Sequence, residues 1–258
     1  MPFEFNGDTY RKFSTHQKEW GTKLIGEFVF RGDERILDLG CGVGVLTAQL
    51  AEHVPDGEVI GIDASHGMIE TAQEYARDNV KYFVMDINNL SFDTTFDVVI
   101  SNATLHWIKN HRVMFEKILH ILNDDGIIRF NFAAEGNCSY FFKVIRKVMA
   151  LDQYAPYFIG FEWPWYMPAL DEYEALLDRL SFSETRVWGE NADRFFPDCE
   201  SLTGWIDQPS IVPFLKQIEQ TDKQGFRDMV VRLMIEETHQ NDGTYFETFR
   251  RINVFARK

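Results

Sequence analysis

The sequence has little of several features that define other protein classes, beginning with cysteine and basic residues. Its three cysteines, Cys41, Cys138 and Cys199, lie far apart, so neither a disulfide framework nor a zinc cluster is predicted. There are only 26 lysine and arginine residues against 40 acidic residues, a formal net charge of −14. Because this charge repels a phosphate backbone, we expect no nucleic-acid partner.

Long uncharged segments are also lacking. No uncharged run reaches the roughly 18 residues of a membrane span, and charges interrupt the N-terminal segment where a signal peptide needs an apolar core. Together with the few cysteines, this predicts a cytoplasmic protein. The sequence contains no internal repeat or Gly/Ser linker, and 258 residues fit one α/β domain with an insertion.

Glycine is concentrated at one turn. Residues 36–47 read ILDLGCGVGVLT, in which a buried-strand pattern passes through Gly40, Gly42 and Gly44 into a helical pattern. Such glycines let a ligand approach the backbone, and the helix that follows offers free N–H groups. A dinucleotide fingerprint needs its third glycine at position 45, which is valine, and no Gly-Lys-Ser/Thr follows as in a phosphate-binding loop. The spacing therefore indicates another kind of nucleotide site.

The segment from 35 to 132 alternates short apolar runs with helical patterns, which is typical of a parallel sheet covered on both faces. The predicted strands are 35–39, 58–62, 80–85, 96–101 and 126–132. The predicted helices are 44–53, 66–77 and 111–122. Ser65 is expected to cap the second helix, and the turn at 124–126 to stop the third.

The second half of the sequence is less regular. It predicts helices at 138–150 and 169–179, a strand at 183–188, two or three helices within 199–240 and a closing strand at 249–256. The helical stretch is expected to break at Pro209 and near Thr221. We expect one domain over 1–258, with 199–240 as an inserted helical cap and the aromatic loop 152–168 contributing to the substrate side.

Acidic residues follow two of the predicted strands. Asp63 closes the second strand, where a carboxylate can accept from both hydroxyls of a ribose, although this fits NAD as well as S-adenosylmethionine. Asp86 follows the third strand, where it can accept from an adenine amine while Ile87 lies against the ring. The alternatives are a solvated acid at position 63 and a turn aspartate at position 86.

Motifs at four strand ends together suggest a family. The Asp38–Gly44 turn, the segment GIDASHGMI at 61–69 and the segment NATLHWI at 102–108 resemble class I S-adenosylmethionine-dependent methyltransferases. With the C-terminal RRINVFARK, the sequence more narrowly resembles the trans-aconitate methyltransferase family over nearly its whole length. The resemblance implies a Rossmann-like, seven-stranded sheet, mostly parallel with an antiparallel last strand, and methyl transfer from S-adenosyl-L-methionine to a carboxylate of a small organic acid, leaving S-adenosyl-L-homocysteine.

The cofactor residues that the resemblance implies come from the N-terminal segment and the strand ends. They are Tyr10, Gln17, Asp38, Gly40, Gly42, Gly44, Asp63, Ala64, Met68, Asp86, Ile87, Asn102 and Ala103. Tyr10 and Gln17 would close over the methionine end of the cofactor, unless their helix only packs on the sheet. Asp38 would attract the methionine ammonium or orient the loop. No metal is expected, because direct methyl displacement needs none and no ligand set stands out.

The acceptor site is predicted less sharply. His106, where the resembled family commonly has Gln, either shapes the site, contacts the substrate or acts as a general base; a carboxylate acceptor needs no base. The substrate candidates are His106, Trp107, Trp163, Trp165 and Trp205, and the cationic candidates are Arg146, Arg186, Arg194, Arg227 and Arg232.

Other functions stay open at this point. The acceptor can instead be a carbon, nitrogen or hydroxyl group of an apolar metabolite, since the aromatic residues of 154–166 can line an apolar site. Outside this class, the chain can be a nicotinamide-dependent oxidoreductase or a binding module without catalysis.

Overall fold

A computed structural model describes residues 15–258, with the side chains of residues 15–18, 208 and 209 excepted. The chain forms two compact units. Unit 1 comprises the described chain up to Glu135, Trp165–Glu190 and Arg251–Lys258. Unit 2 comprises Gly136–Pro164 and Asn191–Arg250, and therefore contains the segment 199–240. Each unit is described by itself below.

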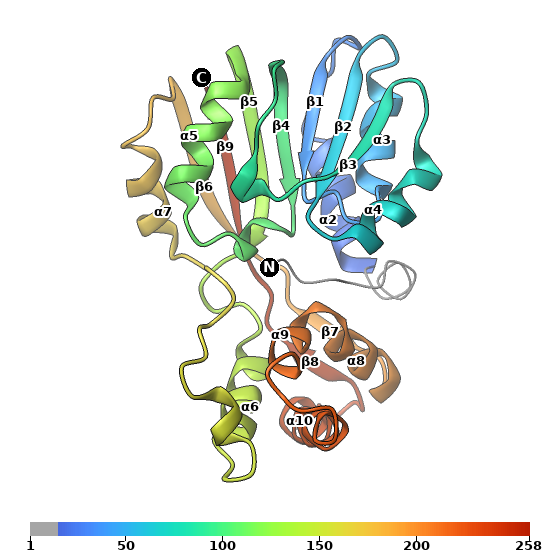
Figure 1. Cartoon of the computed structure of the whole chain (residues 1–258), viewed down its shortest axis with the longest axis vertical. Helices are drawn as coiled ribbons and strands as arrows, with labels where there is room; N and C mark the ends of the chain where they lie inside the picture. Colours follow the sequence, from blue (N-terminus) through green and yellow to red (C-terminus); the bar gives the residue numbers. More distant parts are fainter. Residues whose placement is uncertain (1–14) are drawn as a thin grey trace. The chain divides into compact units, whose positions relative to one another are not determined.

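Unit 1 is built on a seven-stranded sheet with the strand order β3-β2-β1-β4-β5-β9-β6 (Figure 1). The strands are β1 (Arg35–Leu39), β2 (Glu58–Asp63), β3 (Val80–Val84), β4 (Phe96–Asn102), β5 (Leu122–Ala133), β6 (Glu184–Asn191) and β9 (Arg250–Arg257). Neighbouring strands from β3 to β5 pair in parallel, whereas β9 runs antiparallel to β5. This confirms the Rossmann-like sheet with an antiparallel last strand.

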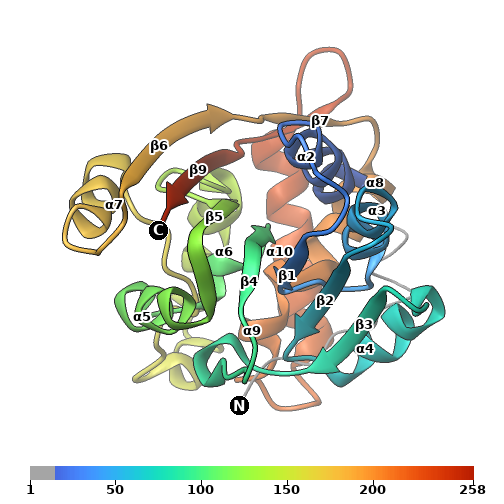
Figure 2. The ribbon, with the colours of Figure 1, turned by 90° about the horizontal axis from the view of Figure 1, so that it is seen from above.

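Helices cover both faces of the sheet (Figure 2). One face carries α2 (Thr15–Ile25), α3 (Val45–His53) and α4 (His66–Ala72), and the other carries α5 (His111–Ile121) and α7 (Leu170–Leu177). Successive side chains along a strand point to opposite faces of the sheet, so each strand contributes to both hydrophobic cores. Ile36 packs on the first face and Leu37 on the second. Both are fully buried, as expected for central parallel strands.

Short 3₁₀ helices follow several elements of unit 1. They are η1 (Gln73–Tyr75), η2 (Ile87–Asn89) and η3 (Leu105–Trp107). The predicted helix 66–77 is thus α-helical only to Ala72.

The predicted role of residues 124–126 is wrong. Helix α5 ends at Ile121, and Leu122 is already extended as the first residue of β5. The pairing of β4 with β5 shifts register between Phe96 and Val98, and Asp125 has a φ of 62°. The Asp-Asp-Gly segment therefore forms an irregularity inside the strand instead of a turn that ends the helix.

Unit 2 is mainly helical. Its elements are α6 (Ser139–Met149), η4 (Ala155–Phe158), β7 (Arg194–Phe196), α8 (Cys199–Trp205), the π-helical segment η5 (Ile206–Ser210), α9 (Val212–Leu215), α10 (Lys223–Thr238) and β8 (Tyr245–Glu247). The expected break near Thr221 lies between α9 and α10, and Pro209 lies in η5 between α8 and α9. The small β7–β8 sheet is absent from the sequence prediction.

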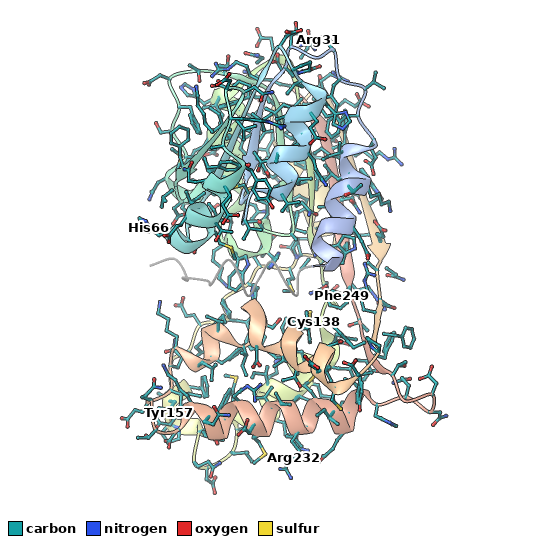
Figure 3. The ribbon with its side chains drawn as sticks, turned by 90° about the vertical axis from the view of Figure 1, so that its right-hand side faces the viewer. Arg31, His66, Cys138, Tyr157, Arg232 and Phe249 are labelled. Carbon is teal, nitrogen blue, oxygen red and sulfur yellow. The ribbon has the colours of Figure 1, made fainter. Side chains whose placement is uncertain are left out.

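Fully buried aromatic side chains fill unit 2, including Phe141, Phe214 and Phe226. The segments around Cys138 and Phe249 lie side by side (Figure 3), because the Cys138 amide donates to the Thr248 carbonyl at 2.8 Å. None of the described helices combines the length and hydrophobicity needed to cross a membrane.

Candidate active site

All three glycines of the turn between β1 and α3 are in the left-handed backbone region. Gly40, Gly42 and Gly44 have φ values of 73°, 54° and 81°, which strain residues that carry a Cβ. A Cβ at Gly40 would also lie 2.1 Å from Cγ2 of Thr104, whose hydroxyl donates to the Gly40 carbonyl at 3.0 Å. The turn therefore requires glycine at position 40 for both its conformation and its packing.

Asp38 lies just before this turn as a buried carboxyl group. Only 1% of its surface is exposed, and the Thr47 hydroxyl donates to it at 2.7 Å. The pKa of Asp38 is raised to about 7, chiefly by burial and also by the charge of Asp63, against the lowering effect of the Thr47 hydrogen bond. A carboxyl group with this pKa is stabilised in its charged form by a cation bound beside it.

Asp63 ties the end of β2 to the glycine turn. One carboxylate oxygen accepts from the Gly42 amide at 3.1 Å and the other from the Ser65 amide at 2.9 Å. Ser65 caps α4 as predicted, since its hydroxyl accepts from the Met68 amide at 3.4 Å. Ala64 and the buried Met68 lie in the same connection.

The ends of β3 and β4 bring two further pairs of candidates to the same edge. One oxygen of Asp86 accepts from the backbone and side-chain nitrogens of Asn88, and Ile87 is buried. Asp86 thus forms the turn foreseen by the alternative interpretation, and its contact with adenine stays a prediction. At the end of β4, Ala103 follows Asn102 with a φ of 60°, and its amide donates to the Asn131 carbonyl at 2.7 Å.

Parallel pairing explains why these residues meet. Leu39 is in register with Ile62, and Asp63 with Val84, so the carboxyl ends of β1, β2 and β3 share one edge of the sheet. Tyr10 lies outside the described residues. Gln17 lies in α2, but its side chain is not among those described. The structure therefore groups the strand-end candidates but leaves the two N-terminal ones as predictions.

His106 lies in η3, directly after β4. Its Nδ1 atom is buried and has no hydrogen-bond partner among the described residues. The pKa of His106 is lowered to about 3, chiefly by burial and also by the positive charge of Arg251. The imidazole is therefore neutral near pH 7 and a weak base, which counts against the general-base interpretation.

Two tryptophans pack near His106 in unit 1. The Trp107 ring lies 5.7 Å from the imidazole and 5.3 Å from the Trp165 ring, measured between centres. The Tyr166 amide donates to the His106 carbonyl at 2.8 Å, which ties this segment to η3. The structure thus places three of the five substrate candidates together.

Known proteins similar to this chain point to one chemistry. A methyltransferase domain model matches residues 36–126. Trans-aconitate 2-methyltransferase of Shigella flexneri is 26% identical over 259 residues, which cover 99% of this chain and 98% of that protein. The chain is an S-adenosylmethionine-dependent methyltransferase. The alternatives of an oxidoreductase and of a binding module without catalysis are thereby set aside.

Solved structures similar to the methyltransferase agree in fold. The YcgJ protein of Bacillus subtilis has a TM-score of 0.62 at 17% identity, covering 93% of this chain and 98% of that chain. Phosphoethanolamine N-methyltransferase 2 of Haemonchus contortus, solved with S-adenosylhomocysteine, has a TM-score of 0.56 at 22% identity, covering 93% and 52%.

The other two tryptophan candidates of the methyltransferase belong to unit 2. Trp163 packs against Phe142 and Phe214, and Trp205 packs against Phe141 and Phe249. Trp205 is buried, with 6% of its surface exposed, so core packing accounts for it. A substrate contact at Trp163 stays a prediction.

The cationic candidates have protein contacts of their own. Arg227 forms a two-pronged ion pair with Asp207, at 2.8 and 2.6 Å. Arg146 lies 4.8 Å from the Trp163 ring centre and Arg186 lies 4.7 Å from that of Trp188. Arg194 lies on β7, and Arg232 contacts the Met229 sulfur. None of these contacts relates the five arginines to the glycine turn.

Sequence reasoning missed Arg251, a buried arginine on β9 with 3% of its surface exposed. In the sequence it looks like a charged position at the start of a terminal strand. One signal was present: Asn131 interrupts the apolar run of the predicted fifth strand and therefore requires a polar partner. Within the described residues, no group of three metal-ligating side chains lies together.

Proposed function

We propose that this methyltransferase makes a methyl ester on a carboxylate of a small organic acid. One observation carries the proposal: His106, the general-base candidate of the sequence analysis, lies in η3 with its Nδ1 atom buried and has a pKa lowered to about 3. A phenol or an ammonium acceptor would need a base working near neutral pH. A carboxylate is already deprotonated there and needs none.

The whole-length similarity to trans-aconitate 2-methyltransferase supports the same acceptor class. At 26% identity it supports a carboxylic acid without selecting trans-aconitate. We propose a small-molecule partner in the cytoplasm and no nucleic-acid partner, since the net charge is −14.

The residues present fit S-adenosylmethionine. The left-handed glycine turn lets backbone approach a ligand, and the buried Asp38 is suited to a cationic group such as the methionine ammonium. We assign the ribose hydroxyls to Asp63, whose carboxylate is held by the Gly42 and Ser65 amides. The adenine is assigned to the pair formed by Asp86 and Ile87.

The remaining cofactor positions surround these groups. We assign the other contacts to Tyr10, Gln17, Gly40, Gly44, Ala64, Met68, Asn102 and Ala103.

When bound, S-adenosylmethionine would supply a methyl group on a positively charged sulfur: a carboxylate oxygen of the acceptor would form a bond to the methyl carbon as the carbon–sulfur bond breaks, leaving a methyl ester and the uncharged thioether sulfur of S-adenosylhomocysteine. No proton is transferred, so the protein has to align the acceptor and exclude water. Orientation of two reactants can lower a barrier by up to roughly 7–11 kcal/mol. We propose that the segment 199–240 is an inserted helical cap that excludes water, and that the aromatic loop 152–168 contributes to the substrate side.

Initial rates across a panel of acceptors test this function. The panel contains mono-, di- and tricarboxylic acids, with trans-aconitate among them, and neutral alcohols, phenols and amines of similar size. We expect labelled methyl transfer to acids only. Transfer to a neutral acceptor, with every acid inert, would contradict the proposal.

The aromatic side chains of unit 2 favour a second candidate, methylation of an apolar metabolite at carbon, nitrogen or oxygen. Phe158, Phe161 and Trp163 are half-buried and contact Phe214. The neutral members of the panel distinguish this acceptor class from acids.

A further inference from the structure

We propose that Thr47 is a positioning residue for the cofactor: its hydroxyl holds the Asp38 carboxylate ionised and oriented to receive the methionine ammonium of S-adenosylmethionine. This inference rests on the proposed function at one point, the assignment of that ammonium to Asp38. It does not depend on which acceptor is methylated. Thr47 acts on cofactor binding through Asp38 and is not itself a catalytic residue.

Thr47 and Asp38 lie on opposite sides of the glycine turn. Asp38 is on β1, before the turn, and Thr47 is in the first turn of α3, after it. Side chains of an α-helix are tilted toward its N-terminus, so α3 directs the Thr47 side chain back toward β1. Its hydroxyl donates to Oδ2 of Asp38 at 2.7 Å. One hydrogen bond therefore connects the two ends of the segment that we assign to the cofactor.

Both members of this hydrogen bond are shielded from solvent. Thr47 is fully buried, and Asp38 has 1% of its surface exposed. A buried carboxylate stays charged only where neighbouring groups compensate its lost hydration, and a hydroxyl donor is such a group. At Asp38, burial and the charge of Asp63 raise the pKa, the Thr47 hydrogen bond lowers it, and the result is about 7. Without this hydrogen bond, we expect the carboxyl group to be largely neutral at pH 7.

The hydrogen-bond donor is itself held in place. Thr47 is β-branched, which restricts its side-chain rotamers in a helix. The start of α3 is anchored as well, because the Gly44 carbonyl accepts from the Ala48 amide at 3.0 Å and from the hydroxyl of Tyr82 on β3 at 2.9 Å. A fixed donor orients the Asp38 carboxylate before the cofactor binds, so less ordering is left for the binding step. A charged carboxylate in this state makes the stronger hydrogen bond to an ammonium.

Titratable side chains from neighbouring elements act on the same cluster. They are Asp63 at the end of β2, Cys41 in the glycine turn and Tyr82 on β3. Burial raises the pKa values of the Cys41 thiol and the Tyr82 hydroxyl, so both groups are uncharged near pH 7. The negative charge of Asp63 opposes ionisation of Asp38. Thr47 therefore favours the charged form of Asp38 against both burial and a neighbouring carboxylate.

The test is a pH profile of binding, which a merely structural role of Thr47 would not change. Titration calorimetry gives the Kd of S-adenosylhomocysteine, which carries the same amino acid part, for the wild type, Thr47→Val and Thr47→Ser at pH 6, 7, 8 and 9. Each variant is compared with the wild type at the same pH, so that titration of the ligand cancels. Tyr82→Phe is the matched control, because it removes a buried hydroxyl that anchors the same turn through Gly44. Thermal melting verifies that each variant folds.

We expect Thr47→Val to bind about tenfold more weakly than the wild type at pH 6 and less than about twofold more weakly at pH 9. The reason is that loss of one hydrogen bond to a charged group raises the pKa of Asp38 by about one unit, and the two proteins converge once both carboxylates are ionised. Thr47→Ser keeps the hydroxyl and should stay within about threefold of the wild type at every pH. Tyr82→Phe should show a ratio to the wild type that does not vary with pH.

A second ligand locates the effect on the cofactor. 5′-Methylthioadenosine has the adenosine part and the thioether but no amino acid part, so its affinity should not depend on the charge of Asp38. We expect its ratio between Thr47→Val and the wild type to be the same from pH 6 to pH 9. A ratio that changes with pH as it does for S-adenosylhomocysteine would overturn the inference, because the ammonium would not be the group concerned.

The outcomes separate this inference from the proposals on which it rests. A steep wild-type profile with a ratio for Thr47→Val that is constant across pH overturns the role of Thr47 alone, and so does a pH-dependent ratio of the same size in Tyr82→Phe. A wild-type affinity that does not change with pH overturns the assignment of the ammonium to Asp38 together with this inference. The proposed ester formation is tested separately, since no acceptor is present. If Thr47→Val does not fold, Thr47→Ala removes the same hydroxyl and is judged by the same ratios.

Discussion

Burial shifts the pKa of several ionisable side chains in this methyltransferase. The clearest case among the residues proposed to bind the cofactor is Asp38, with a pKa raised to about 7. Its raised pKa means that the folded, ligand-free protein holds this proton more tightly than the unfolded chain. Asp38 therefore contributes stability below its ordinary pKa, and this contribution is lost as the pH rises through about 7.

A cation bound beside Asp38 stabilises the ionised carboxylate and therefore lowers its pKa again. We predict that affinity for S-adenosylmethionine increases with pH by up to about tenfold per unit below pH 7 and then levels off, because binding requires the ionised carboxylate. Titration calorimetry at several pH values measures this, with Asp38→Asn as the control that should bind weakly with a flatter pH profile. An equally steep profile in Asp38→Asn would assign the titration to another group.

His106 gives a second prediction at this scale. A general base contributes about 10²–10⁴-fold to a rate, whereas a neutral side chain that shapes the site contributes far less. We therefore expect His106→Gln to lower kcat by less than about tenfold, with kcat independent of pH above 6 in both proteins. Steady-state kinetics across pH check this, and a loss of more than a hundredfold would restore the general-base role.

At the scale of elements, the turn between β1 and α3 depends on glycine for two separable reasons. Gly40 and Gly160 have nearly the same φ, 73° and 75°, but a Cβ at Gly160 would meet nothing within 4 Å. We predict that Gly160→Ala costs about 1–2 kcal/mol of unfolding free energy, the cost of the left-handed backbone alone. Gly40→Ala should cost clearly more, because its Cβ overlaps Thr104.

Chemical denaturation of the two variants measures the difference, and S-adenosylhomocysteine affinity shows whether the turn has moved. If both variants lose the same unfolding free energy, Thr104 moves away from the new Cβ at no energetic cost, which contradicts the prediction.

The start of α6 provides the fourth prediction. Glu247 is fully buried, and its two carboxylate oxygens accept from the backbone amides of Tyr140 and Phe141, at 3.1 and 2.8 Å. Burial raises the pKa of Glu247 to about 7, although these hydrogen bonds oppose the shift. The stability contributed by this group is therefore present below its ordinary pKa and is lost as the pH rises through about 7.

We expect the difference in unfolding free energy between the wild type and Glu247→Gln to shift against the wild type as the pH rises from 5 to 8. Denaturation at both pH values measures it. A difference that is independent of pH would show that Glu247 does not titrate in this range.

The sequence predicts elements well where local patterns decide them. Apolar runs gave β1 and β4 within a residue, because central parallel strands are buried on both faces. The sequence did not predict the irregularity at Asp125, because the same Asp-Asp-Gly residues form a turn after a helix or an irregularity within a strand. The sequence did not predict the small β7–β8 sheet either, because its strands are short and pair across about 50 residues of sequence.

At the scale of the whole molecule, features set by local motifs are predicted from the sequence more completely than features set by long-range contacts. Asp38, Asp63 and Asp86 are local motifs at strand ends, and parallel pairing alone brings them to one edge. Arg251 and Asn131 meet only when β9 inserts beside β5, a contact across 120 residues of sequence. Contacts of this kind cannot be read from local spacing.

The division into two units likewise depends on long-range contacts. Unit 2 is assembled from two separate stretches of the chain, 136–164 and 191–250. Sequence periodicity predicted the helices in 199–240 and the helix that is α6, but it did not predict that α6 packs against α10.

The central claim is that the transferred methyl group ends on a carboxylate oxygen. The most direct measurement is the fate of that group when the labelled product of the enzyme is treated with mild alkali. A methyl ester is hydrolysed and releases the label as methanol, whereas methyl groups on nitrogen, carbon or an ether oxygen stay attached. We predict complete release of the label as methanol; a label that stays on the product would contradict the account.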